Sequence, residues 1–522
     1  MTFTRAHLIR RTAPTAAAAA LALAYLIVAP PGADLPAQLL RVRLFAAEGL
    51  GVWNNWWYGG QYVLGYSVLF PPLGWLLGPR LLAALASVGT AAAAEALAHA
   101  RYGDDAWVGA IWLGAGTCSE LLSGRLTFAL GLCGAVLAAL FLERRRPRWA
   151  AVCACAATLA SPVAGLFAAL AGAAVLWRGL RTRDRRRERA GAAVAAPALA
   201  IIVVVALLFP TGGEQPFAAG TLGAVVAAGA LLLLLAPGAT LTAAIVMYLG
   251  GCLLAFLIPT PLGSNAARLG ELLAGPLVAL TLVPRRAWLL LALAAAPLAY
   301  LQWHSAISDL RSGSAAARPA YYRPLLRLLR AQPGVWRVEV PFTAGHWESD
   351  WLAAAVPLAR GWERQTDIAD DRLFYGGRLT AARYHAWLSR LAVRYVAVPD
   401  VPPDPSAVAE RRLIRGGLSF LRLLRRLPHW TVYAVRHPTP LATGAGRVRS
   451  LGPDTVSLTI AHPGRVLVRV RWSPYWRLSG VAGCVRPAAG GLTRIDATGG
   501  GRAQLGMDVT LGRVGSRAPR CN

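Results

Sequence analysis

Long runs of Ala, Leu and Val fill the first 303 residues, and short clusters of Arg separate these runs. A helix that crosses a bilayer needs about 20 apolar residues. Hydrophobic residues make up 56% of the chain and charged residues only 15%, with a mean hydropathy of +0.46, whereas soluble proteins are nearer a quarter charged. The composition argues against a wholly soluble enzyme, a disordered protein and a disulfide-stapled miniprotein. It predicts an integral membrane protein with a soluble region.

The first apolar run, 15–30, follows three arginines near the N-terminus. Because further apolar runs follow it, we interpret it as an uncleaved first span that starts in the cytoplasm rather than as a signal peptide. The further single spans are expected at 79–98, 106–118, 124–142, 193–210, 219–236, 238–258, 267–283 and 287–302.

The apolar stretch Trp149–Trp177 lies between two Arg clusters and has Ser161 and Pro162 at its middle. A single helix would leave one Arg cluster outside, so we expect two short helices that turn at this Ser-Pro pair, a break that is tolerated inside a bundle. The predicted fold is an α-helical polytopic bundle of about eleven spans, residues 1–303, followed by a soluble region.

Arginine also orients the bundle. The chain carries a net charge of +29, and all 54 of its basic residues are Arg. With the N-terminus in the cytoplasm, seventeen arginines fall in inner loops and five on the outer side: Arg41, Arg43, Arg80, Arg125 and Arg268. This asymmetry follows the positive-inside rule and predicts a multi-pass cell-membrane protein with its C-terminal region extracytoplasmic. We expect a lipid-bilayer partner and no nucleic acid, because the charge follows the topology instead of forming a groove.

The composition changes near residue 303, and two soluble domains are predicted after it. Residues 304–437 mix helical and strand patterns and indicate an α/β domain, whereas 438–522 has the short alternating runs of a small, sandwich-like β domain. The helices and strands expected are 322–331 and 379–391, and 336–342, 393–398, 430–435, 456–460 and 465–472. Of seven cysteines, only Cys484 and Cys521 lie in this region, so a single disulfide between them is a plausible pairing.

The first outer loop holds the candidate catalytic residue. Asp34 lies a few residues beyond the first span, at head-group depth, where a carboxylate can accept a proton from a hydroxyl. A solvated charge that orients the loop is an equally weighted interpretation. The loop continues into a polar and aromatic segment that we interpret as a membrane-interface belt or as a platform for sugar rings. Its candidate substrate-binding residues are Trp53, Asn54, Asn55, Trp56, Trp57 and Tyr58.

Two other outer loops carry polar groups that could bind substrate: Glu120, Arg125, Asn265, Arg268 and Glu271. Arginine forks suit phosphate oxygens. The alternatives are a snorkelling side chain for Arg125 and an internal ion pair between Arg268 and Glu271, three residues apart.

An acidic cluster in the soluble region comprises Glu363, Asp367, Asp370 and Asp371. We expect a solvated loop paired with Arg rather than a metal site, because the spacing matches no calcium loop. No zinc spacing, phosphate-binding loop or serine-hydrolase motif occurs in the sequence. No cofactor is predicted, and a divalent metal requirement stays open.

Several short motifs resemble the C-type (GT-C) glycosyltransferase superfamily of polytopic membrane enzymes. They are Asp34 after the first span, the Gly/Trp-rich loop, 70–73 (Phe-Pro-Pro-Leu), 123–128 (Ser-Gly-Arg-Leu-Thr-Phe) and Ser161-Pro162. The soluble region resembles those of bacterial GT-C-type and YfhO-like membrane proteins at 393–399 and 472–476. The resemblance implies an acidic catalytic residue in the first outer loop and a polyprenyl-phosphate-linked sugar as donor.

The leading hypothesis is a membrane glycosyltransferase that moves a sugar from this lipid donor to a cell-envelope glycan or lipid acceptor at the outer face. The alternative is a non-catalytic GT-C-like protein of envelope polysaccharide assembly or binding, which the isolation of Asp34 from other acidic residues favours. A secondary transporter ranks third, because the sequence has no internal repeat and its ionisable groups lie at the span ends.

Overall fold

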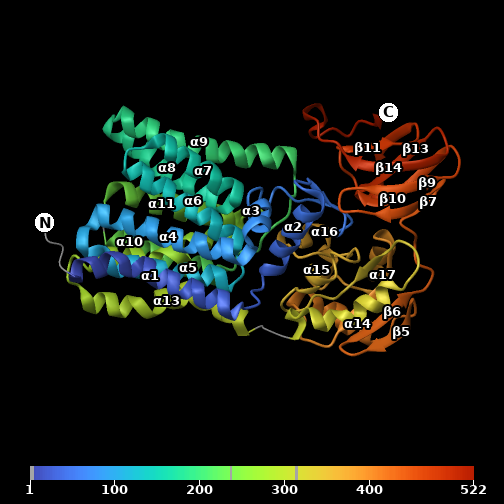
Figure 1. The fold of residues 1–522 in the computed structure, drawn as a ribbon, viewed down its shortest axis with the longest axis horizontal. Helices are drawn as coiled ribbons and strands as arrows, with labels where there is room; N and C mark the ends of the chain where they lie inside the picture. The colour runs from blue at the N-terminus through green and yellow to red at the C-terminus, as the bar shows by residue number, and fades with distance from the viewer. Residues whose placement is uncertain (1–4, 236–237, 312–314) are drawn as a thin grey trace. The chain divides into compact units, whose positions relative to one another are not determined.

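The structure is a computed structural model that describes residues 5–235, 238–311 and 315–522. The chain forms two compact units, one helical and one that contains the strands (Figure 1). The first unit consists of Met1–Leu35, Tyr66–Val204 and Gly212–Ser312. The second unit consists of Pro36–Gly65, Val205–Thr211 and Gly313–Asn522.

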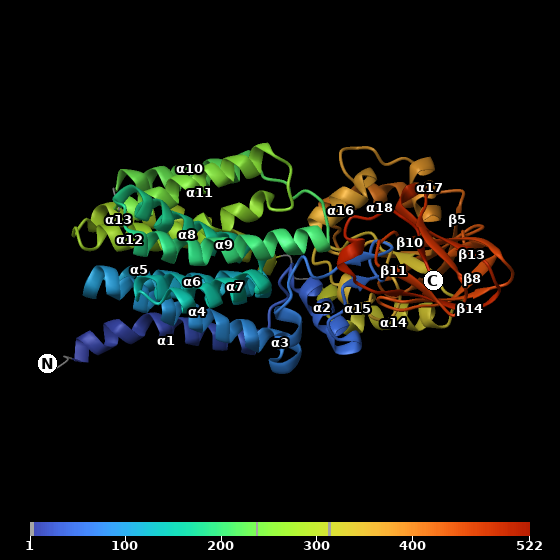
Figure 2. The same cartoon turned by 90° about the horizontal axis from the view of Figure 1, so that it is seen from above.

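The first unit is a bundle of helices that run roughly along one direction (Figure 2). Its helices are α1 (Arg5–Val28), α3 (Phe70–Leu77), α4 (Pro79–Tyr102), α5 (Trp107–Leu122), α6 (Leu126–Glu143), α7 (Pro147–Ala160), α8 (Pro162–Thr182), α9 (Arg185–Leu208), α10 (Ala219–Leu234), α11 (Ala239–Leu257), α12 (Arg268–Leu282) and α13 (Trp288–Arg311).

Six helical segments of the described chain are long and apolar enough to cross a membrane, and this supports the membrane assignment. They are Pro79–Leu122, Leu126–Glu143, Pro162–Thr182, Arg185–Leu208, Ala239–Leu257 and Trp288–Leu310. Two further apolar helices are shorter, Thr12–Val28 and Ala219–Leu234. The coarse prediction of a polytopic helical region is thus supported. The predicted number of about eleven spans is not shown, because only six segments of the described chain meet the length and hydropathy of a span.

The predicted break at Ser161-Pro162 is confirmed. Helix α7 ends at Ala160, Ser161 is extended with φ −156° and ψ 117°, and α8 begins at Pro162 and packs back on α7. Proline suits the first turn of α8, where a backbone N–H has no helical partner. The Ser-Pro pair therefore divides one apolar stretch into a helical hairpin.

Small residues let the helices of this unit approach closely. A Cβ on Gly191 of α9 would lie 2.4 Å from the backbone nitrogen of Leu176 in α8, and one on Gly172 of α8 would lie 2.8 Å from that of Ala195. Neither position has room for a side chain. Close backbone approach through Gly and Ala is typical of membrane helix packing, where dispersion contacts replace the hydrophobic effect.

The α/β part of the second unit is a four-stranded sheet in the order β3-β4-β6-β5, in which only β3 and β4 pair in parallel. Tyr321 and Tyr322 of helix α14 pack on Trp430 at one face, and α17 and α18 pack on the other. The elements are α14 (Pro319–Arg330), β3 (Arg337–Glu339), α15 (Glu348–Trp351), α16 (Arg364–Asp370), α17 (Ala381–Arg390), β4 (Val393–Pro399), α18 (Val408–Arg415), β5 (Leu421–Leu427) and β6 (Trp430–Val435). All the elements predicted for 304–437 are present, with shifts of a few residues at their ends.

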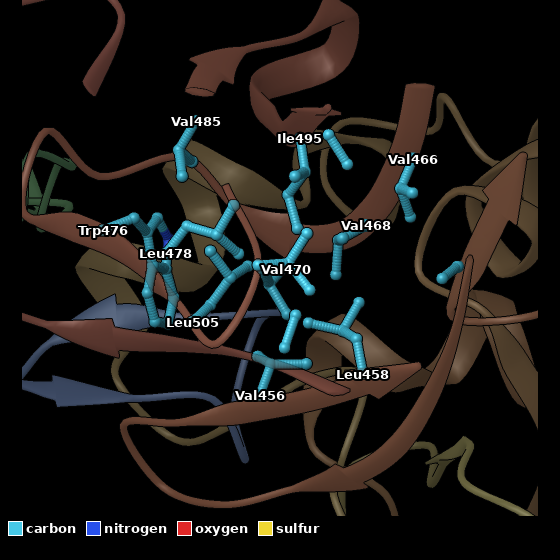
Figure 3. Packing of buried hydrophobic residues seen from close by; sticks show 14 of the residues in the cluster. Val456, Leu458, Val466, Val468, Val470, Trp476, Leu478, Val485, Ile495 and Leu505 are labelled. Carbon is cyan, nitrogen blue, oxygen red and sulfur yellow. The ribbon is translucent and has the colours of Figure 1, made fainter. Parts of the chain in front are cut away.

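The C-terminal part consists of two antiparallel sheets, β15-β12-β13-β10-β7 and β11-β14-β9-β8, that share one apolar core (Figure 3). Alternate residues of each strand point into it, as the alternation of buried and half-buried residues in β10 illustrates. The Cys484–Cys521 disulfide joins β12 to β15. The strands are β7 (Ala442–Gly444), β8 (Gly446–Leu451), β9 (Val456–Ile460), β10 (Gly464–Arg471), β11 (Trp476–Ser479), β12 (Gly483–Pro487), β13 (Leu492–Ala497), β14 (Gly501–Met507) and β15 (Arg520–Cys521).

The loop after the first span belongs to the second unit and not to the bundle. It forms helix α2 (Leu35–Glu48) and a short hairpin, β1 (Trp53–Asn54) and β2 (Gln61–Tyr62). Trp53 and Tyr62 join the core of the β domain, where Trp53 packs edge-on to Trp476. The predicted boundary near residue 303 therefore does not separate the two units completely, because residues 36–65 fold with the C-terminal region.

Candidate functional site

Two glycines bring Asp34 to the turn between α5 and α6. A Cβ on Gly32 would lie 2.5 Å from the backbone nitrogen of Gly124, and one on Gly124 would lie 2.7 Å from that of Leu35. Gly124 also has φ +76°, a conformation that disfavours other residues. The backbone N–H of Asp34 donates to the carbonyl of Ser123 at 3.2 Å. Only glycine at both positions permits this contact, which fixes the carboxylate beside Arg125.

Asp34 lies between two guanidinium groups in the first unit. Its Oδ2 is 3.5 Å from Nε of Arg125 and 3.9 Å from Nη2 of Arg268. Nη1 of Arg125 is in turn 3.7 Å from Oε2 of Glu120. The structure thus brings together Asp34, Glu120, Arg125 and Arg268, four of the predicted site residues, from three separate chain segments.

The contacts within this group are ion pairs without good hydrogen bonds. Hydrogen bonds from N–H to O are usually 2.7–3.2 Å long, shorter than all three separations above. Nε of Arg125 and Oε2 of Glu120 are buried and have no hydrogen-bond partner in the described part of the chain. Because a buried polar group without a partner costs free energy, such groups need a structural or functional reason. The group has donors available for an anionic ligand.

Arg125 remains a cation at this position. Burial by itself lowers the pKa of the Arg125 guanidinium, but the carboxylates of Glu120 and Asp34 outweigh burial and hold the pKa above its ordinary value. A stable positive charge beside a partly exposed carboxylate is the arrangement that an anionic leaving group needs.

Two further polar residues lie near this group, and the sequence reasoning missed both. Asp309 near the end of α13 lies within electrostatic range of Asp34 and hydrogen-bonds the Ser123 side chain. His304, one turn earlier in α13, lies within electrostatic range of Glu271. Ionisable residues just after the last predicted span could have indicated these positions. They were overlooked because residues from 304 onward were assigned to the soluble region.

Glu271 and Asn265 occupy less direct positions. Glu271 lies within electrostatic range of Arg125 and Arg268, whereas the ion pair of Arg268 found in the structure is with Asp34. This ion pair of Arg268 thus joins two chain segments and is not the internal α12 pair that was the alternative interpretation. Asn265 is half-buried in the 3₁₀ turn before α12, and its side chain has no hydrogen bond to a described residue.

A groove of about 480 Å³ lies between α10 and α13. Its walls are mainly Ala and Leu side chains, with Thr221, Tyr300 and His304 as the polar members. An apolar groove with few polar groups suits a hydrocarbon ligand. Because His304 also lies within range of Glu271, one end of this groove approaches the charged group around Arg125.

The aromatic segment of the first loop is part of a protein core. Trp57 and Tyr58 are 1% and 0% exposed, and the Trp57 indole donates to the carbonyl of Ser349 at 3.2 Å. Ring faces at such positions cannot stack on a sugar unless the core opens, so these residues are not included in the candidate site. The buried members of the segment are Trp53, Asn54, Asn55, Trp57 and Tyr58, and Trp56 is half-buried.

Asn54 and Asn55 hold the backbone of this segment. Oδ1 of Asn54 accepts from the N–H of Trp56 at 2.9 Å, and Nδ2 of Asn55 donates to the carbonyl of Gly452 at 3.1 Å. The Asn55 Oδ1 accepts from the indole of Trp53 at 2.8 Å. Asn54 therefore fixes the loop backbone, and Asn55 joins the loop to the β domain.

The acidic cluster of the second unit is paired with Arg, as expected, but it is not solvated. Asp367 is fully buried, and Asp371 is 1% exposed. Arg360 donates to Asp367 from Nε and Nη2 at 3.0 and 2.7 Å, and from Nη1 to Glu410 at 3.4 Å. Its guanidinium lies 3.9 Å from the ring centres of both Phe342 and Phe374. The prediction of a solvated loop is wrong, because Arg360 and the two aromatic rings stabilise the buried Asp367, and Arg390 pairs with the buried Asp371.

Within residues 5–235, 238–311 and 315–522, no group of three or more His, Cys, Asp and Glu side chains is arranged to hold a metal ion. No protein-family model matches the chain, and no curated protein resembles it in sequence.

Proposed function

We propose that the protein is a GT-C-type membrane glycosyltransferase, which moves a sugar from a polyprenyl-phosphate donor to an envelope glycan or lipid acceptor. The observation that carries the proposal is the position of Asp34 beside Arg125 and Arg268, together with the buried Nε of Arg125, which has no hydrogen-bond partner among the described residues. A base next to unsaturated cations matches the chemistry of sugar transfer from a phosphate leaving group.

In the proposed reaction, Asp34 accepts the proton of an acceptor hydroxyl while that oxygen attacks the anomeric carbon. A new glycosidic C–O bond forms, and the bond from the anomeric carbon to the phosphate oxygen breaks. The phosphate leaves with the bonding electron pair, and Arg125 and Arg268 stabilise its negative charge. The scheme parallels an inverting glycosidase in which the acceptor hydroxyl replaces water.

The groove between α10 and α13 supports a lipid-linked donor. Its apolar walls suit an isoprenoid chain, and His304 marks the end that approaches the charged group. A chain bound in this groove would present its phosphate towards the arginines, while the reacting sugar stays near Asp34.

The proposed topology has about eleven spans, a cytoplasmic N-terminus and an extracytoplasmic second unit. The excess of Arg in the assigned inner loops supports this orientation. The Cys484–Cys521 disulfide also supports it, because disulfides persist in oxidising compartments outside the cytosol. A reporter fused after Asn522 should be active only outside the cytoplasmic membrane, and a cytoplasmic reporter signal would contradict the topology.

The test of function uses purified full-length protein and radiolabelled polyprenyl-phosphate sugars. Asp34→Asn should reduce transfer by at least about 100-fold, the contribution of a general base. Asp184→Asn is the matched control, because Asp184 is a part-exposed acid that caps α9 with its Oδ1, a role that Asn can keep. Undiminished transfer by Asp34→Asn would remove this residue from the mechanism.

A non-catalytic lipid-glycan-binding protein is the second candidate. The observation that favours it is that Asp34 already has two arginine partners, as a structural ion-pair network would. On this alternative the wild-type protein binds the labelled lipid but yields no product with any acceptor offered. Product formation that depends on Asp34 would exclude it.

A further inference from the structure

The second unit keeps its acids inside and its arginines outside. Residues 315–522 contain 31 Arg and 13 Asp or Glu. Eight of these acids are buried, whereas only three of the arginines are: Arg337, Arg360 and Arg411. The surface of this segment therefore carries a large excess of positive charge. Codon bias can raise the number of arginines, but it cannot explain why the compensating acids are buried.

Helix α14 carries three of the exposed arginines in a row along its surface. In α14, Arg323, Arg327 and Arg330 are all exposed and follow each other at intervals of four and three residues, which places them on one helix face. The opposite face carries Tyr322 and Leu329, which are fully buried. The row therefore faces away from the sheet that α14 covers.

The edge strand β5 adds arginines on the same side of the sheet. Arg422 pairs with Ala434 of β6 and Arg425 pairs with Val432, and an irregularity between Leu423 and Arg425 gives both the same orientation. Residues directly opposite in a sheet share a face, and Val432 is two residues from Trp430, which packs on α14. Both arginines are exposed. We call Arg323, Arg327, Arg330, Arg422 and Arg425 the α14–β5 surface.

No described carboxylate neutralises the α14–β5 surface. None of its five arginines forms an ion pair with a residue in the described ranges. Asp400, which lies at the end of β4, accepts from Tyr321 and contacts His429 instead. Clustered charge without partners creates a positive potential that attracts anions.

We propose that the α14–β5 surface binds an extended anionic glycan polymer through its carboxylate or phosphate groups. Arginine forks bind both groups, and rows on a helix and a strand suit a chain rather than a compact ion. A bilayer is less favoured, because every large apolar side chain of α14 is buried or half-buried, which leaves none exposed to insert into lipid. The Cys484–Cys521 disulfide points to an oxidising compartment, which argues against nucleic acid. The proposal does not depend on catalysis at Asp34.

The test measures binding of labelled polymers to the full-length protein in detergent. Polygalacturonate supplies carboxylates, poly(glycerol phosphate) supplies phosphates, and dextran of similar length is the uncharged control. We expect one or both anionic polymers to bind, and dextran not to bind. The triple variant Arg323→Gln, Arg327→Gln, Arg330→Gln should weaken binding about tenfold, as the loss of three exposed charge contacts predicts.

The matched control is the triple variant Arg447→Gln, Arg465→Gln, Arg502→Gln. These arginines are exposed on the β domain, so the change in net charge is the same. Equal weakening by both variants would overturn the proposal, because net charge alone would then explain binding. Binding of neither polymer, or α14-dependent binding only to DNA or to vesicles of anionic lipid, would also overturn it. Both triple variants should keep sugar-transfer activity on a small soluble acceptor, which separates this test from that of the proposed function.

Discussion

Two buried guanidinium groups, Arg360 in the second unit and Arg125 in the first, differ in how their nitrogens are hydrogen-bonded. In the second unit, all three nitrogens of Arg360 donate to carboxylates at 2.7–3.4 Å, and two phenyl rings cover the guanidinium. In the first unit, Arg125 approaches its two carboxylates only to 3.5 and 3.7 Å, and its Nε has no hydrogen-bond partner among the described residues. A guanidinium whose nitrogens all donate to carboxylates stabilises the fold, whereas one with an unsatisfied N–H keeps a donor for a ligand. The comparison therefore separates a structural site from a candidate functional one.

The largest effect on stability is expected at Arg360. Arg360→Met removes the only cation that contacts Asp367 and Glu410 at hydrogen-bonding distance in the described structure and leaves these acids buried without it. We expect the free energy of unfolding to fall by about 4 kcal/mol or more, as for a broken buried ion pair. Denaturant unfolding followed by tryptophan fluorescence measures it, with the exposed Arg372→Met as control. Equal stability of the two variants would contradict the structural role.

The second expectation concerns the aromatic loop. Trp57→Ala should lower the free energy of unfolding by about 3 kcal/mol, because a fully packed indole leaves a cavity. Trp56→Ala, at a half-buried neighbour, should change it by about 1 kcal/mol or less. Limited proteolysis and thermal unfolding report both changes. If Trp57→Ala abolished sugar binding while the stability stayed unchanged, the loop would be a ligand platform after all.

A third, smaller effect concerns pH. Burial raises the pKa of the Glu348 carboxyl to about 7, despite hydrogen bonds from Thr343 that lower it. Between its ordinary pKa near 4.5 and about 7, the folded state holds a proton that the unfolded state loses, so this contribution to stability is full at low pH and disappears as the pH rises through 7. Glu410 shifts in the same direction, to about 7.

The measurement compares unfolding free energies at pH 5 and pH 8. Wild-type protein should lose stability over this interval, and Glu348→Gln should reduce the loss by about 1–3 kcal/mol, because Gln does not titrate. Glu48→Gln, at an exposed position of α2, should leave the pH dependence unchanged. An identical pH profile for wild type and Glu348→Gln would contradict the assigned shift.

The smallest effect on stability is expected at Arg125. Arg125→Gln should lower the free energy of unfolding by about 1 kcal/mol, less than Arg360→Met, because the ion pairs of Arg125 are long and the new amide can still donate to the buried Glu120. Sugar transfer, in contrast, should fall by about 100-fold or more if the guanidinium stabilises the leaving phosphate. A loss of stability like that of Arg360→Met would make Arg125 a structural residue and remove the contrast between the two clusters.

The local elements were largely predictable because their signals lie in neighbouring residues. The break at Ser161-Pro162, strand β6 at Trp430–Val435 and strand β9 at Val456–Ile460 occur where the sequence predicted them. Proline chemistry and the two-residue period of a strand act over a few positions, so they are readable from the chain alone.

The candidate site was predictable only in part. Asp34, Arg125 and Arg268 stood out because ionisable residues at the ends of apolar runs are rare. The sequence did not predict that these three residues lie close together, because their proximity depends on close backbone contact at Gly32 and Gly124. The contribution of Asp309 also needed the structure, since α13 continues to Arg311, beyond the predicted span 287–302.

The sequence by itself determined that this chain has apolar helices of membrane length, a β-rich C-terminal region and a strong excess of Arg. Only the tertiary structure decided that the Trp-rich loop is a core element and that the acids at 363–371 are largely buried. The physical reason is that helix and strand patterns record local periodicity, whereas burial of a tryptophan or a carboxylate depends on partners hundreds of residues away. Trp57 meets Ser349, and Asn55 meets Gly452, only after the chain has folded.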